Sequence, residues 1–285
     1  MATILVTGAA GQLGRDVVEH VGRHGDDVVG LDRSDFDLAT DDASAVLAAH
    51  RPDAVINCAA YTAVDAAESD ADAAFAANEH GVRRLAEGCA AHGAHLVHVS
   101  TDYVFDGSLD RPYREDDTTG PRSVYGRSKL AGEQAAAEVL GTGVTIARTS
   151  WVCGEHGHNM VSLVLRLAAD PDQPLAFVDD QIGHPTFTTD LAAALRHLAI
   201  ERPGGVIHTT NRRAVSWYGF VQEILAAAGH DPARVRPITT AELVPPRPAP
   251  RPANSVLENA RWDAAGWTPL RDFAAPLAEL VARLR

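Results

Sequence analysis

A tyrosine and a lysine four residues apart, Tyr125 and Lys129, stand in the run SVYGRSKLAGE. On a helix this spacing places both side chains on one face. An ammonium group there can lower the pKa of the phenol from its ordinary value of ~10, so that the phenol can exchange a proton with a carbonyl or alcohol oxygen. Such pairs are also common on solvated helix faces, so the rest of the chain must decide what this one does.

The elements that could place a cofactor beside this pair begin at the N-terminus. The run ATILVTGAAGQLG predicts an apolar strand and a glycine-rich turn at Gly8, Gly11 and Gly14, followed by a helix. Such a turn lets the backbone approach a pyrophosphate, whose charge the helix N-terminus favours. A second predicted strand ends at Asp32, whose carboxylate could bind ribose hydroxyls, but Arg33 follows and could bind a 2′-phosphate instead. The choice between NAD and NADP therefore stays open.

The composition favours a soluble enzyme. The chain has 285 residues, of which 46% are hydrophobic and 22% charged, enough for a sizeable core in one large or two modest domains. Its net charge of −13 and its lack of a Lys/Arg cluster disfavour a nucleic-acid partner. No apolar run is long enough to span a bilayer, and the N-terminus has the pattern of a strand and not of a cleavable signal. We therefore expect a cytoplasmic protein without a membrane partner.

The cysteines and histidines show no disulfide or metal-binding pattern. Cys58, Cys89 and Cys153 are too few and too widely spaced for a disulfide framework or a thiolate metal site, so we expect reduced thiols. Two groups of histidines lack recognisable ligand spacing, and we interpret them as surface or loop residues: His92, His95 and His98, and His156 and His158.

Strands and helices alternate through the first half of the chain. The runs ILVTG, DVVGLD, AVINCAA, HLVHVST and VTIART are short and apolar, and Ala-rich amphipathic stretches such as DAAFAANEHGVRRLAEGCAAHG separate them. This order predicts an α/β protein of the Rossmann type, with a doubly wound parallel sheet covered by helices on both faces. Beyond Arg148 loops become frequent, helices are expected over 160–168, 189–199 and 217–228, and GGVIHTT predicts a late strand that rejoins the sheet.

These patterns divide the chain into two parts. Residues 1–152, with about 184–212, are expected to form the dinucleotide-binding Rossmann domain. Residues of about 153–183 and 213–285 are expected to form a smaller, loop-rich C-terminal substrate lobe over the carboxyl edge of the sheet, where open α/β folds bind ligands. The Pro-rich segment 245–252 is interpreted as a rigid, extended crossing, since only one helix-sized stretch follows it.

Eight segments, taken in order, give the chain a resemblance to a known family. They are GAAGQLG at 8–14, NCAAYTAVDAAE at 57–68, STDYVFDG at 100–107, YGRSKLAGE at 125–133, RTSWVCG at 148–154, DDQIGHPT at 179–186, SWYGF at 216–220 and RPANSVL at 251–257. Together they resemble the extended short-chain dehydrogenases/reductases and, among these, the dTDP-4-dehydrorhamnose reductase family. The resemblance implies reduction of the C4 keto group of a dTDP-4-keto-6-deoxyhexose by NADPH or NADH.

The same resemblance implies roles for individual residues. Thr101, Tyr125 and Lys129 are the implied catalytic set, in which Tyr125 donates a proton to the carbonyl oxygen, Lys129 stabilises the phenolate and Thr101 orients the carbonyl. The implied cofactor contacts, beyond Tyr125 and Lys129, are Gly8, Gly11, Gln12, Leu13, Gly14, Asp32, Arg33, Asp37, Leu38, Ala59, Ala60 and Tyr61. The implied substrate contacts are Thr101, Asp102, Val104, Phe105, Trp151, Asn159, Arg251 and Asn254.

Several alternatives stay open. Departures from the family pattern at Cys153 and His158 lie on the presumed sugar side, so the substrate could be another dTDP-deoxysugar, of the antibiotic-sugar or dihydrostreptose type. A non-catalytic regulatory subunit of the same fold is a second alternative, which the intact Thr101, Tyr125 and Lys129 disfavour. A dehydratase is disfavoured because no Glu follows the Thr-Asp pair at 101–102. Some family members form homodimers with Mg²⁺ bound by acidic side chains, but no such ligands can be assigned in this sequence.

Overall fold

The computed structural model describes residues 1–285 and centres on one six-stranded sheet. Its strands are all parallel, in the order β2-β1-β3-β4-β5-β10. They are β1 (Thr3–Thr7), β2 (Asp27–Leu31), β3 (Ala54–Asn57), β4 (His95–Thr101), β5 (Val144–Thr149) and β10 (Gly205–His208). The strand order reverses between β1 and β3, and doubly wound folds bind ligands at such a point, beyond the carboxyl ends of the strands.

The sequence predicts all six strands of this sheet. The five apolar runs of the first half form β1 to β5, and the late run forms β10, which pairs with β5. Every residue of β3 and β5 is buried, as a sheet covered on both faces requires. The prediction of a Rossmann-type parallel sheet is confirmed.

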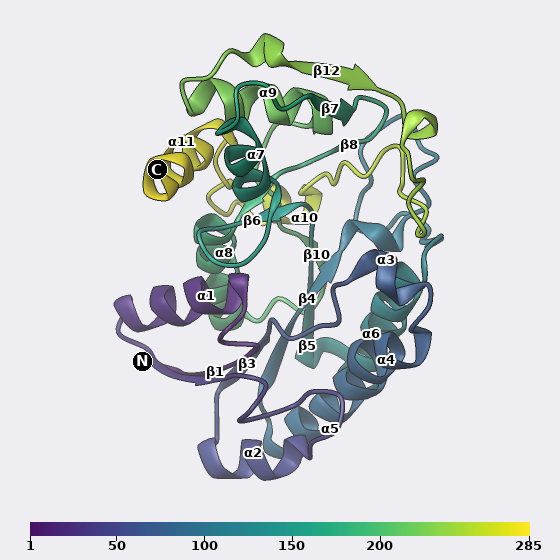
Figure 1. The fold of residues 1–285 in the computed structure, drawn as a ribbon. Helices are drawn as coiled ribbons and strands as arrows, with labels where there is room; N and C mark the ends of the chain where they lie inside the picture. Colours follow the sequence, from purple (N-terminus) through teal and green to yellow (C-terminus); the bar gives the residue numbers. More distant parts are fainter.

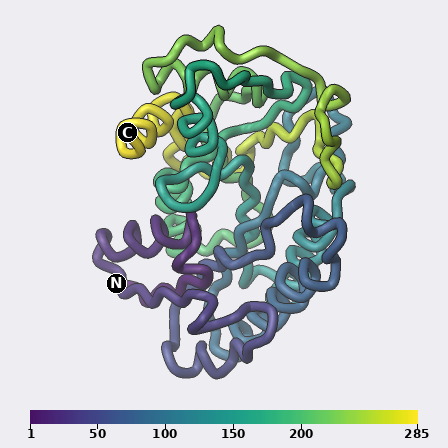
Figure 2. Tube along the Cα trace, viewed as in Figure 1, coloured from purple at the N-terminus to yellow at the C-terminus, as the bar shows by residue number.

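Helices cover both faces of the sheet, as Figures 1 and 2 show. On one face α1 (Gln12–Arg23) packs against α8 (Thr188–Glu201), and on the other α5 (Val82–His92) packs against α2 (Ala43–His50) and α6 (Val124–Leu140). Each layer encloses its own cluster of buried apolar side chains with the sheet. The sheet is therefore held rigidly, and the loops at its carboxyl edge are anchored at both ends.

The segment between β3 and β4 contains an unusual turn. α3 (Val64–Ala67) and α4 (Ala71–Phe75) are short, and a π-helical turn, η1 (Ala76–Gly81), joins α4 to α5. The sequence predicts one amphipathic stretch here, and the π-helical turn that interrupts it has no simple periodic signal. The turn carries Asn78 into the interior of the protein.

A second lobe lies over the carboxyl edge of the sheet, at the top of Figure 1, and has its own apolar cluster. Its strands form three pairs: β6 (Val152–Cys153) with β9 (Thr186–Phe187), β7 (Leu175–Val178) with β12 (Val235–Ile238), and β8 (Ile182–Gly183) with β11 (Val215–Ser216). Its helices are α7 (Met160–Ala168), α9 (Trp217–Ala227) and α11 (Ala274–Leu284). The three helices predicted for the second half form as α7, α8 and α9 with nearly the predicted bounds.

The Pro-rich segment 245–252 has no helix or strand and returns the chain from the second lobe to the first. There the carboxylate of Asp65 accepts hydrogen bonds from the N–H of Ala249, at 3.2 Å, and from the guanidinium of Arg251. Two helices follow, α10 (Ala260–Ala264) and α11, where the sequence indicates only one. Trp262 of α10 packs into the cluster between α8 and the sheet.

Short 3₁₀ turns complete the chain: η2 (Asp102–Val104), η3 (Gly141–Gly143), η4 (Pro232–Arg234) and η5 (Thr240–Glu242). None of the helices combines the length and the apolar character that crossing a bilayer requires.

Candidate active site

The glycine-rich turn after β1 is packed too closely for side chains. Gly8 has a φ of +68°, and a Cβ there would lie 2.8 Å from the backbone nitrogen of Ala59. A Cβ on Gly14 would lie 2.1 Å from the carbonyl oxygen of Gly8. Gly11 precedes α1, whose first turn has neither a side-chain cap nor an acidic side chain. The close backbone packing and the uncapped helix N-terminus fit the pyrophosphate of a dinucleotide.

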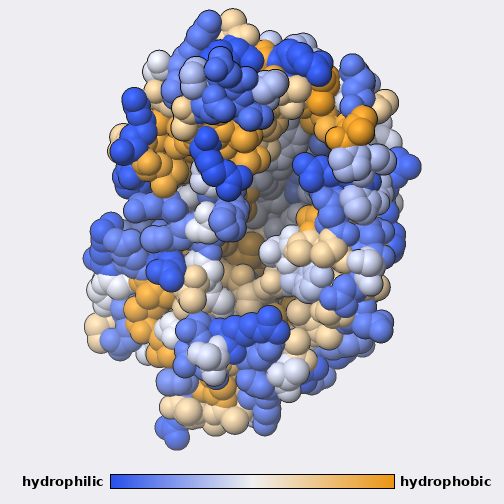
Figure 3. All heavy atoms as spheres, in the orientation of Figure 1, coloured by the Kyte–Doolittle hydropathy of each residue, from blue (hydrophilic) through white to orange (hydrophobic).

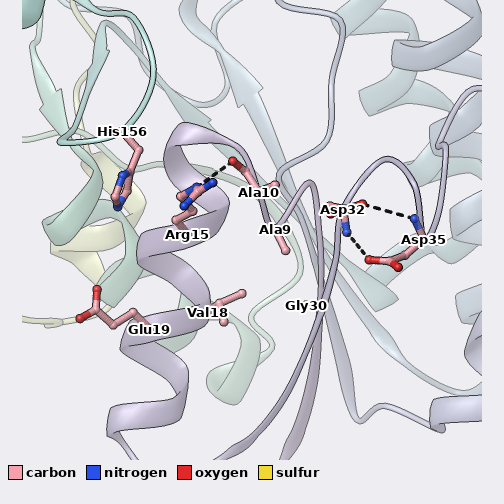
Figure 4. A pocket seen from close by; sticks show the side chains of 9 residues that line it. All are labelled: Ala9, Ala10, Arg15, Val18, Glu19, Gly30, Asp32, Asp35 and His156. Atoms are coloured by element: carbon pink, nitrogen blue, oxygen red, sulfur yellow. Dashed lines mark hydrogen bonds between the residues drawn. The ribbon is translucent and has the colours of Figure 1, made fainter.

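A pocket of about 520 Å³ lies beside this turn, between α1 and the end of β2. Figure 4 shows the side chains that line it. Asp32 and Asp35 lie on one side of it, and Arg15 and His156 on the other. The Asp32 carboxylate accepts hydrogen bonds from the hydroxyl and the N–H of Ser34, at 2.6 and 2.7 Å, and these bonds lower the pKa of Asp32. An ionised carboxylate at this position fits the predicted contact with ribose hydroxyls.

Arg33 and Asp37, two further predicted cofactor contacts, form an ion pair with each other. The Nε of Arg33 lies 3.0 Å from Oδ2 of Asp37, and the arginine side chain is 86% exposed. A hydrogen bond from the N–H of Ala39 and the pairing with Arg33 lower the pKa of Asp37. Because exposed ion pairs contribute little free energy, Arg33 can exchange this partner for a phosphate at small cost.

The loop after β3 carries the predicted wall residues Ala59, Ala60 and Tyr61, and buried amides fix it from behind. The N–H of Ala59 donates to Oδ1 of Asn57 at 3.1 Å. Asn78 bonds both backbone groups of Tyr61, at 2.9 and 3.0 Å, and donates to Oγ of Ser128 on α6 at 3.0 Å. The π-helical turn thus joins the wall to the helix that carries the tyrosine and lysine, a role for Asn78 that the sequence does not indicate.

Thr101, Tyr125 and Lys129 come from two neighbouring elements. Thr101 is the last residue of β4, and Tyr125 lies in the first turn of α6, after the N-cap residue Ser123. The ring of Tyr125 packs edge to face against Tyr103, with ring centroids 5.6 Å apart. The predicted spacing on a helix is confirmed, and it places the phenol beside the end of β4.

The electrostatics of Tyr125 differ from the expectation. Burial raises the pKa of Tyr125, and hydrogen bonding with the Thr101 hydroxyl offsets only part of this rise. Nζ of Lys129 points into the sheet instead, donating to the carbonyl of Val99 at 2.8 Å and lying 3.2 Å from Nε2 of His98. The expectation that Lys129 lowers the pKa of the phenol is therefore wrong for this arrangement. A phenol with a raised pKa keeps its proton at neutral pH, but it releases that proton less readily than an ordinary tyrosine until negative charge develops on the acceptor.

Asp102 follows Thr101 directly and is 2% exposed. Burial raises its pKa to about 6, although hydrogen bonds, including one from the Thr101 hydroxyl at 2.9 Å, offset part of the rise. This carboxyl group therefore changes charge at mildly acidic pH, next to the two side chains that converge at the end of β4.

Trp151 lies at the base of the second lobe in a strained backbone conformation. Its φ is +46°, which is rare for a bulky residue, and its indole stacks face to face on Trp217 with centroids 3.5 Å apart and planes inclined by 8°. A Cβ on Gly183 would lie 2.6 Å from the Trp151 ring, so the glycine leaves the space that the indole occupies. Both residues are partly exposed.

Arg251 does not extend freely over the cleft. Its guanidinium, with the side chain 16% exposed, binds both carboxylate oxygens of Asp65 and donates to the carbonyl of Ala249 at 2.7 Å. Arg247 lies 3.5 Å from the same carboxylate. An ion pair with α3 therefore holds Arg251 in place, and a diphosphate would have to compete with Asp65 for the guanidinium.

Comparisons with known proteins agree with this geometry. The RmlD substrate binding domain family matches residues 1–285. The chain belongs to this family. It is 50% identical to the dTDP-4-dehydrorhamnose reductase of Streptomyces griseus, over 96% of this chain and 91% of that protein. It is 46% identical to the probable dTDP-4,6-dihydroxy-2-methyloxan-3-one 4-ketoreductase of Streptomyces antibioticus, over 96% of this chain and 93% of that protein.

A solved structure of a relative shows the same fold. The dTDP-4-dehydrorhamnose reductase of Bacillus anthracis, in complex with NADP, superposes with a TM-score of 0.91 at 33% identity, over 99% of this chain and 98% of that one. The resemblance found in the sequence to the dTDP-4-dehydrorhamnose reductase family is therefore confirmed.

In this member of the RmlD family, four apolar residues predicted as ligand contacts are core residues. Leu13 and Leu38 are 8% and 5% exposed and pack in the clusters on opposite faces of the sheet. Val104 and Phe105 are also buried, and the ring of Phe105 stacks on Tyr113 with centroids 4.3 Å apart. The side chains of these four residues fill the interior behind the site, and contacts of Leu13, Leu38, Val104 and Phe105 with ligands stay predictions.

Two asparagines of the predicted substrate set have partners within the protein. Asn254 donates to the carbonyls of Leu109 and Arg111, both at 2.9 Å. Asn159 caps α7 and donates to Oε1 of Gln12 at 2.9 Å, which ties the second lobe to the first turn of α1. These bonds brace the edges of the RmlD fold, and contacts of Asn159, Asn254 and Gln12 with ligands stay predictions.

The interpretation of the histidines as surface residues is wrong for two positions on β4. His95 is 5% exposed and bonds Oγ1 of Thr145 at 2.9 Å, and His98 is fully buried between Asn57 and Lys129. Their position inside an apolar run that is buried on both faces is the signal that could have identified them.

The three cysteines form no disulfide bond. No group of three or more His, Cys, Asp or Glu side chains is arranged to hold a metal ion.

Proposed function

We propose that this protein reduces the C4 keto group of a dTDP-4-keto-6-deoxyhexose with NADPH or NADH, and that its principal substrate is dTDP-4-dehydro-L-rhamnose, which yields dTDP-L-rhamnose. The observation that carries the proposal is the convergence of Thr101 and Tyr125 at the carboxyl edge of the sheet, two strands from the glycine-rich turn. Relatives that are 50% and 46% identical carry the names of dTDP-4-keto sugar reductases, which supports this reaction class.

The residues that would bind the dinucleotide are assigned by starting from the glycine-rich turn after β1. Gly8, Gly11, Gly14 and the N-terminus of α1 would hold the pyrophosphate, Asp32 the adenosine ribose, and residues 59–61 the wall of the site. A bound reduced nicotinamide would supply the hydride that the C4 carbon accepts. The close packing at Gly8 and Gly14, where a Cβ would meet backbone within 3 Å, supports this assignment.

The remaining steps belong to side chains of this chain. Tyr125 donates its phenolic proton to the C4 oxygen as negative charge develops there, and its raised pKa ensures that the proton is present at neutral pH. The hydroxyl of Thr101 donates its single hydrogen to Asp102 at 2.9 Å, and by turning that hydrogen to the C4 oxygen it would orient the carbonyl. Lys129, one helical turn from Tyr125, would stabilise the phenolate and bind ribose hydroxyls once Nζ turns away from Val99.

The second lobe would bind the nucleotide-sugar. Figure 3 shows a hollow between the two lobes, open on the face drawn. Arg251 would bind the diphosphate through its planar guanidinium, in exchange for Asp65, and Trp151 would pack against the hexose. The diphosphate would compensate for the lost contact with Asp65, because its two phosphates together carry more negative charge than one carboxylate.

A second candidate substrate is favoured by one relative. The probable 4-ketoreductase that is 46% identical acts, by its name, on a different dTDP-4-keto sugar. The purified protein should therefore be offered a panel of dTDP-4-keto-6-deoxy sugars with NADPH and with NADH, and cofactor oxidation and product configuration should be measured. Turnover is expected, fastest with dTDP-4-dehydro-L-rhamnose. Absence of turnover with every sugar, together with retained dinucleotide binding, would instead favour a regulatory subunit.

We also propose the organisation of the molecule. The dinucleotide-binding part comprises residues 1–152 and about 184–212, and the nucleotide-sugar part about 153–183 and 213–285, with Trp262 linking the second to the core of the first. The expected form is a cytoplasmic homodimer without nucleic-acid or membrane partners, and the net charge of −13 supports the lack of affinity for nucleic acid. Sedimentation with Mg²⁺ and with a chelator would test both the dimer and its dependence on the ion.

A further inference from the structure

A buried chain of hydrogen bonds leads from the first strand of the sheet to Lys129. The hydroxyl of Thr7 donates to Oδ1 of Asn57 at 2.6 Å, Nδ2 of Asn57 lies 3.0 Å from Nδ1 of His98, and Nε2 of His98 lies 3.2 Å from Nζ of Lys129. The four residues are at most 2% exposed. Their polar atoms must therefore find their partners within the protein.

The direction of these bonds follows from one fixed donor. The backbone N–H of Ala59 lies 3.1 Å from Oδ1 of Asn57, and because an amide N–H can only donate, this atom of the side chain must be the oxygen. The amide nitrogen of Asn57 then faces His98, so Nδ1 of His98 accepts. In a neutral imidazole the proton consequently resides on Nε2, the atom that faces Lys129.

An N–H directed at Nζ discriminates between the two forms of the lysine. An ammonium group has three N–H donors and no lone pair, whereas an amine can accept one hydrogen bond and still donate to the carbonyl of Val99, which lies 2.8 Å away. We propose that Asn57 and His98 are positioning residues that present the Nε2–H of His98 to Nζ of Lys129 and so favour the amine over the ammonium.

The other groups that face Lys129 do not counteract this preference strongly. Glu133, on the same helix, is bound to Arg148 by an ion pair of 2.6 Å, and burial raises the pKa of Cys58 to about 12, so that the thiol is uncharged. Tyr125 is also uncharged because burial raises its pKa. Burial lowers the pKa of Lys129 to about 8 and that of His98 well below its ordinary value, in agreement with a neutral imidazole beside a lysine whose amine form is more accessible than that of an ordinary lysine.

This inference rests on the proposed reduction. It also gives a reason why His98 and Lys129 are buried side by side. Tyr125 loses a proton in each turnover and has to regain one. A lysine that titrates near neutral pH can pass a proton to the phenolate, become an amine, and take up a replacement proton from water. His98 acts through Lys129, and Asn57, which also binds the N–H of Ala59, reaches Lys129 only through His98.

The first test is the position of the imidazole proton in the purified protein without substrate or cofactor. Nitrogen NMR of protein labelled in the histidine rings distinguishes a protonated from an unprotonated ring nitrogen, and His98→Gln assigns the signal. The expected result is a neutral His98 with protonated Nε2 and bare Nδ1 between pH 6 and pH 9. The opposite tautomer, or a doubly protonated ring, would overturn the proposal.

The second test reverses the tautomer. Asn57→Asp keeps an acceptor for Thr7 and Ala59 but turns a carboxylate oxygen towards Nδ1 of His98, so the proton should move to Nδ1 and leave Nε2 free to accept from an ammonium. The titration midpoint of Lys129, followed by NMR of its side chain, should then rise by about one unit or more. His95→Gln is the matched control, because His95 is buried on the same strand but bonds Thr145.

The proposal fails if the Lys129 midpoint in Asn57→Asp equals that of the wild type or moves only as far as in His95→Gln. If Asn57→Asp does not fold, the tautomer of His98 in the wild-type protein decides alone. None of these measurements uses substrate, so their results do not depend on the proposed substrate. Likewise, the result of the reduction assay does not depend on which tautomer His98 adopts in the free protein.

Discussion

The two sides of the cleft hold their polar groups in opposite ways. On the cofactor side, the N-terminus of α1 has no side-chain cap, and Asn78 fixes the wall loop from behind. On the substrate side, Arg251 is bound to Asp65, and Trp151 is stacked on Trp217. On the proposed assignments, the glycine-rich turn and the wall loop are organised for their ligand in advance. Arg251 would have to exchange Asp65 for the substrate, so the binding free energy on that side would be a difference between two sets of interactions.

The largest expected effect tests whether chemistry depends on the phenol that lies between the two sides. Tyr125→Phe should lower kcat by roughly a hundredfold or more, because a positioned general acid contributes about that much. The Kd for NADPH, measured by fluorescence titration, should stay close to that of the wild type. Tyr218→Phe, which removes a hydroxyl bonded to Gln222 on α9, is the control and should keep full activity. A near-wild-type kcat in Tyr125→Phe would disprove the assigned role.

The next effect tests the exchange of partners on the substrate side. Arg251→Ala should raise the KM for the dTDP-sugar by about 30-fold, since a charge-assisted hydrogen bond is worth about 2 kcal/mol, and should leave the Kd for NADPH nearly unchanged. Arg251→Lys should recover only part of the loss. Asp65→Asn weakens the competing ion pair and should tighten the binding of dTDP, measured by calorimetry.

Equal weakening of dTDP and NADPH in Arg251→Ala would mean that the ion pair with Asp65 maintains the fold, and the substrate role of Arg251 would be abandoned. Weaker binding of dTDP by Asp65→Asn would show that the carboxylate holds the guanidinium in place for the substrate and does not compete with it.

A smaller effect, on the free energy of unfolding, is expected at Asp102, which follows the last residue of β4. The pKa of Asp102 is about 6 in the folded protein, against ~3.9 in an unfolded chain, so the folded state binds more protons between these values. The free energy of unfolding should therefore fall as the pH rises from about 4 to about 6. Asp102→Asn should remove this dependence and be about 1 kcal/mol more stable at pH 7, because the new amide, which itself needs an acceptor, offsets part of a ~3 kcal/mol linkage.

Urea denaturation at pH 4 and pH 7 measures this effect. Asp106→Asn is the matched control, because hydrogen bonding with Ser108 and Tyr113 lowers the pKa of Asp106, so that its contribution to stability is present at neutral pH and is lost as the pH falls. The control should be less stable than the wild type at pH 7. An equal loss of stability in both variants would contradict the burial argument for Asp102.

The smallest effect is expected on the cofactor side, where only one charge changes. Wild-type protein should use NADPH and NADH without large discrimination, because Asp32 favours a free ribose hydroxyl while Arg33 can neutralise a 2′-phosphate. Asp32→Ala should shift the ratio of kcat/KM values towards NADPH by about tenfold, or ~1.4 kcal/mol. Asp35→Ala, which alters the same cavity, is the control. A thousandfold discrimination by the wild type would refute this balance.

The sequence predicts those features that depend on local pattern. Apolar runs with turn signals at their ends identify the strands of the sheet, and Gly8 and Gly14 are recognisable because only glycine fits their close backbone contacts. The helical spacing of Tyr125 and Lys129 is also a local property. For these reasons the sheet, the glycine-rich turn and the helix that carries Tyr125 and Lys129 could be predicted from the residues alone.

Contacts between distant segments could not be predicted in the same way. Asp65 and Arg251 are 186 residues apart, and nothing in either segment indicates that they pair. The direction in which Lys129 points depends on His98 and the carbonyl of Val99, which belong to another element. Burial of Phe105 depends on stacking with Tyr113. Family resemblance identifies functional positions but does not distinguish a side chain in the cleft from one that supports it from behind.

The π-helical turn also determines how the protein opens locally. A Cβ on Gly132 would lie 2.0 Å from the carbonyl oxygen of Asn78, so α6 and the turn pass each other with only a glycine between them. The backbone amides of residues 76–81 should consequently exchange with solvent together with those of α6, and more slowly than those of the exposed loops. The helix that carries Tyr125 and Lys129 and the loop at residues 59–61 are thus expected to open as one cooperative unit.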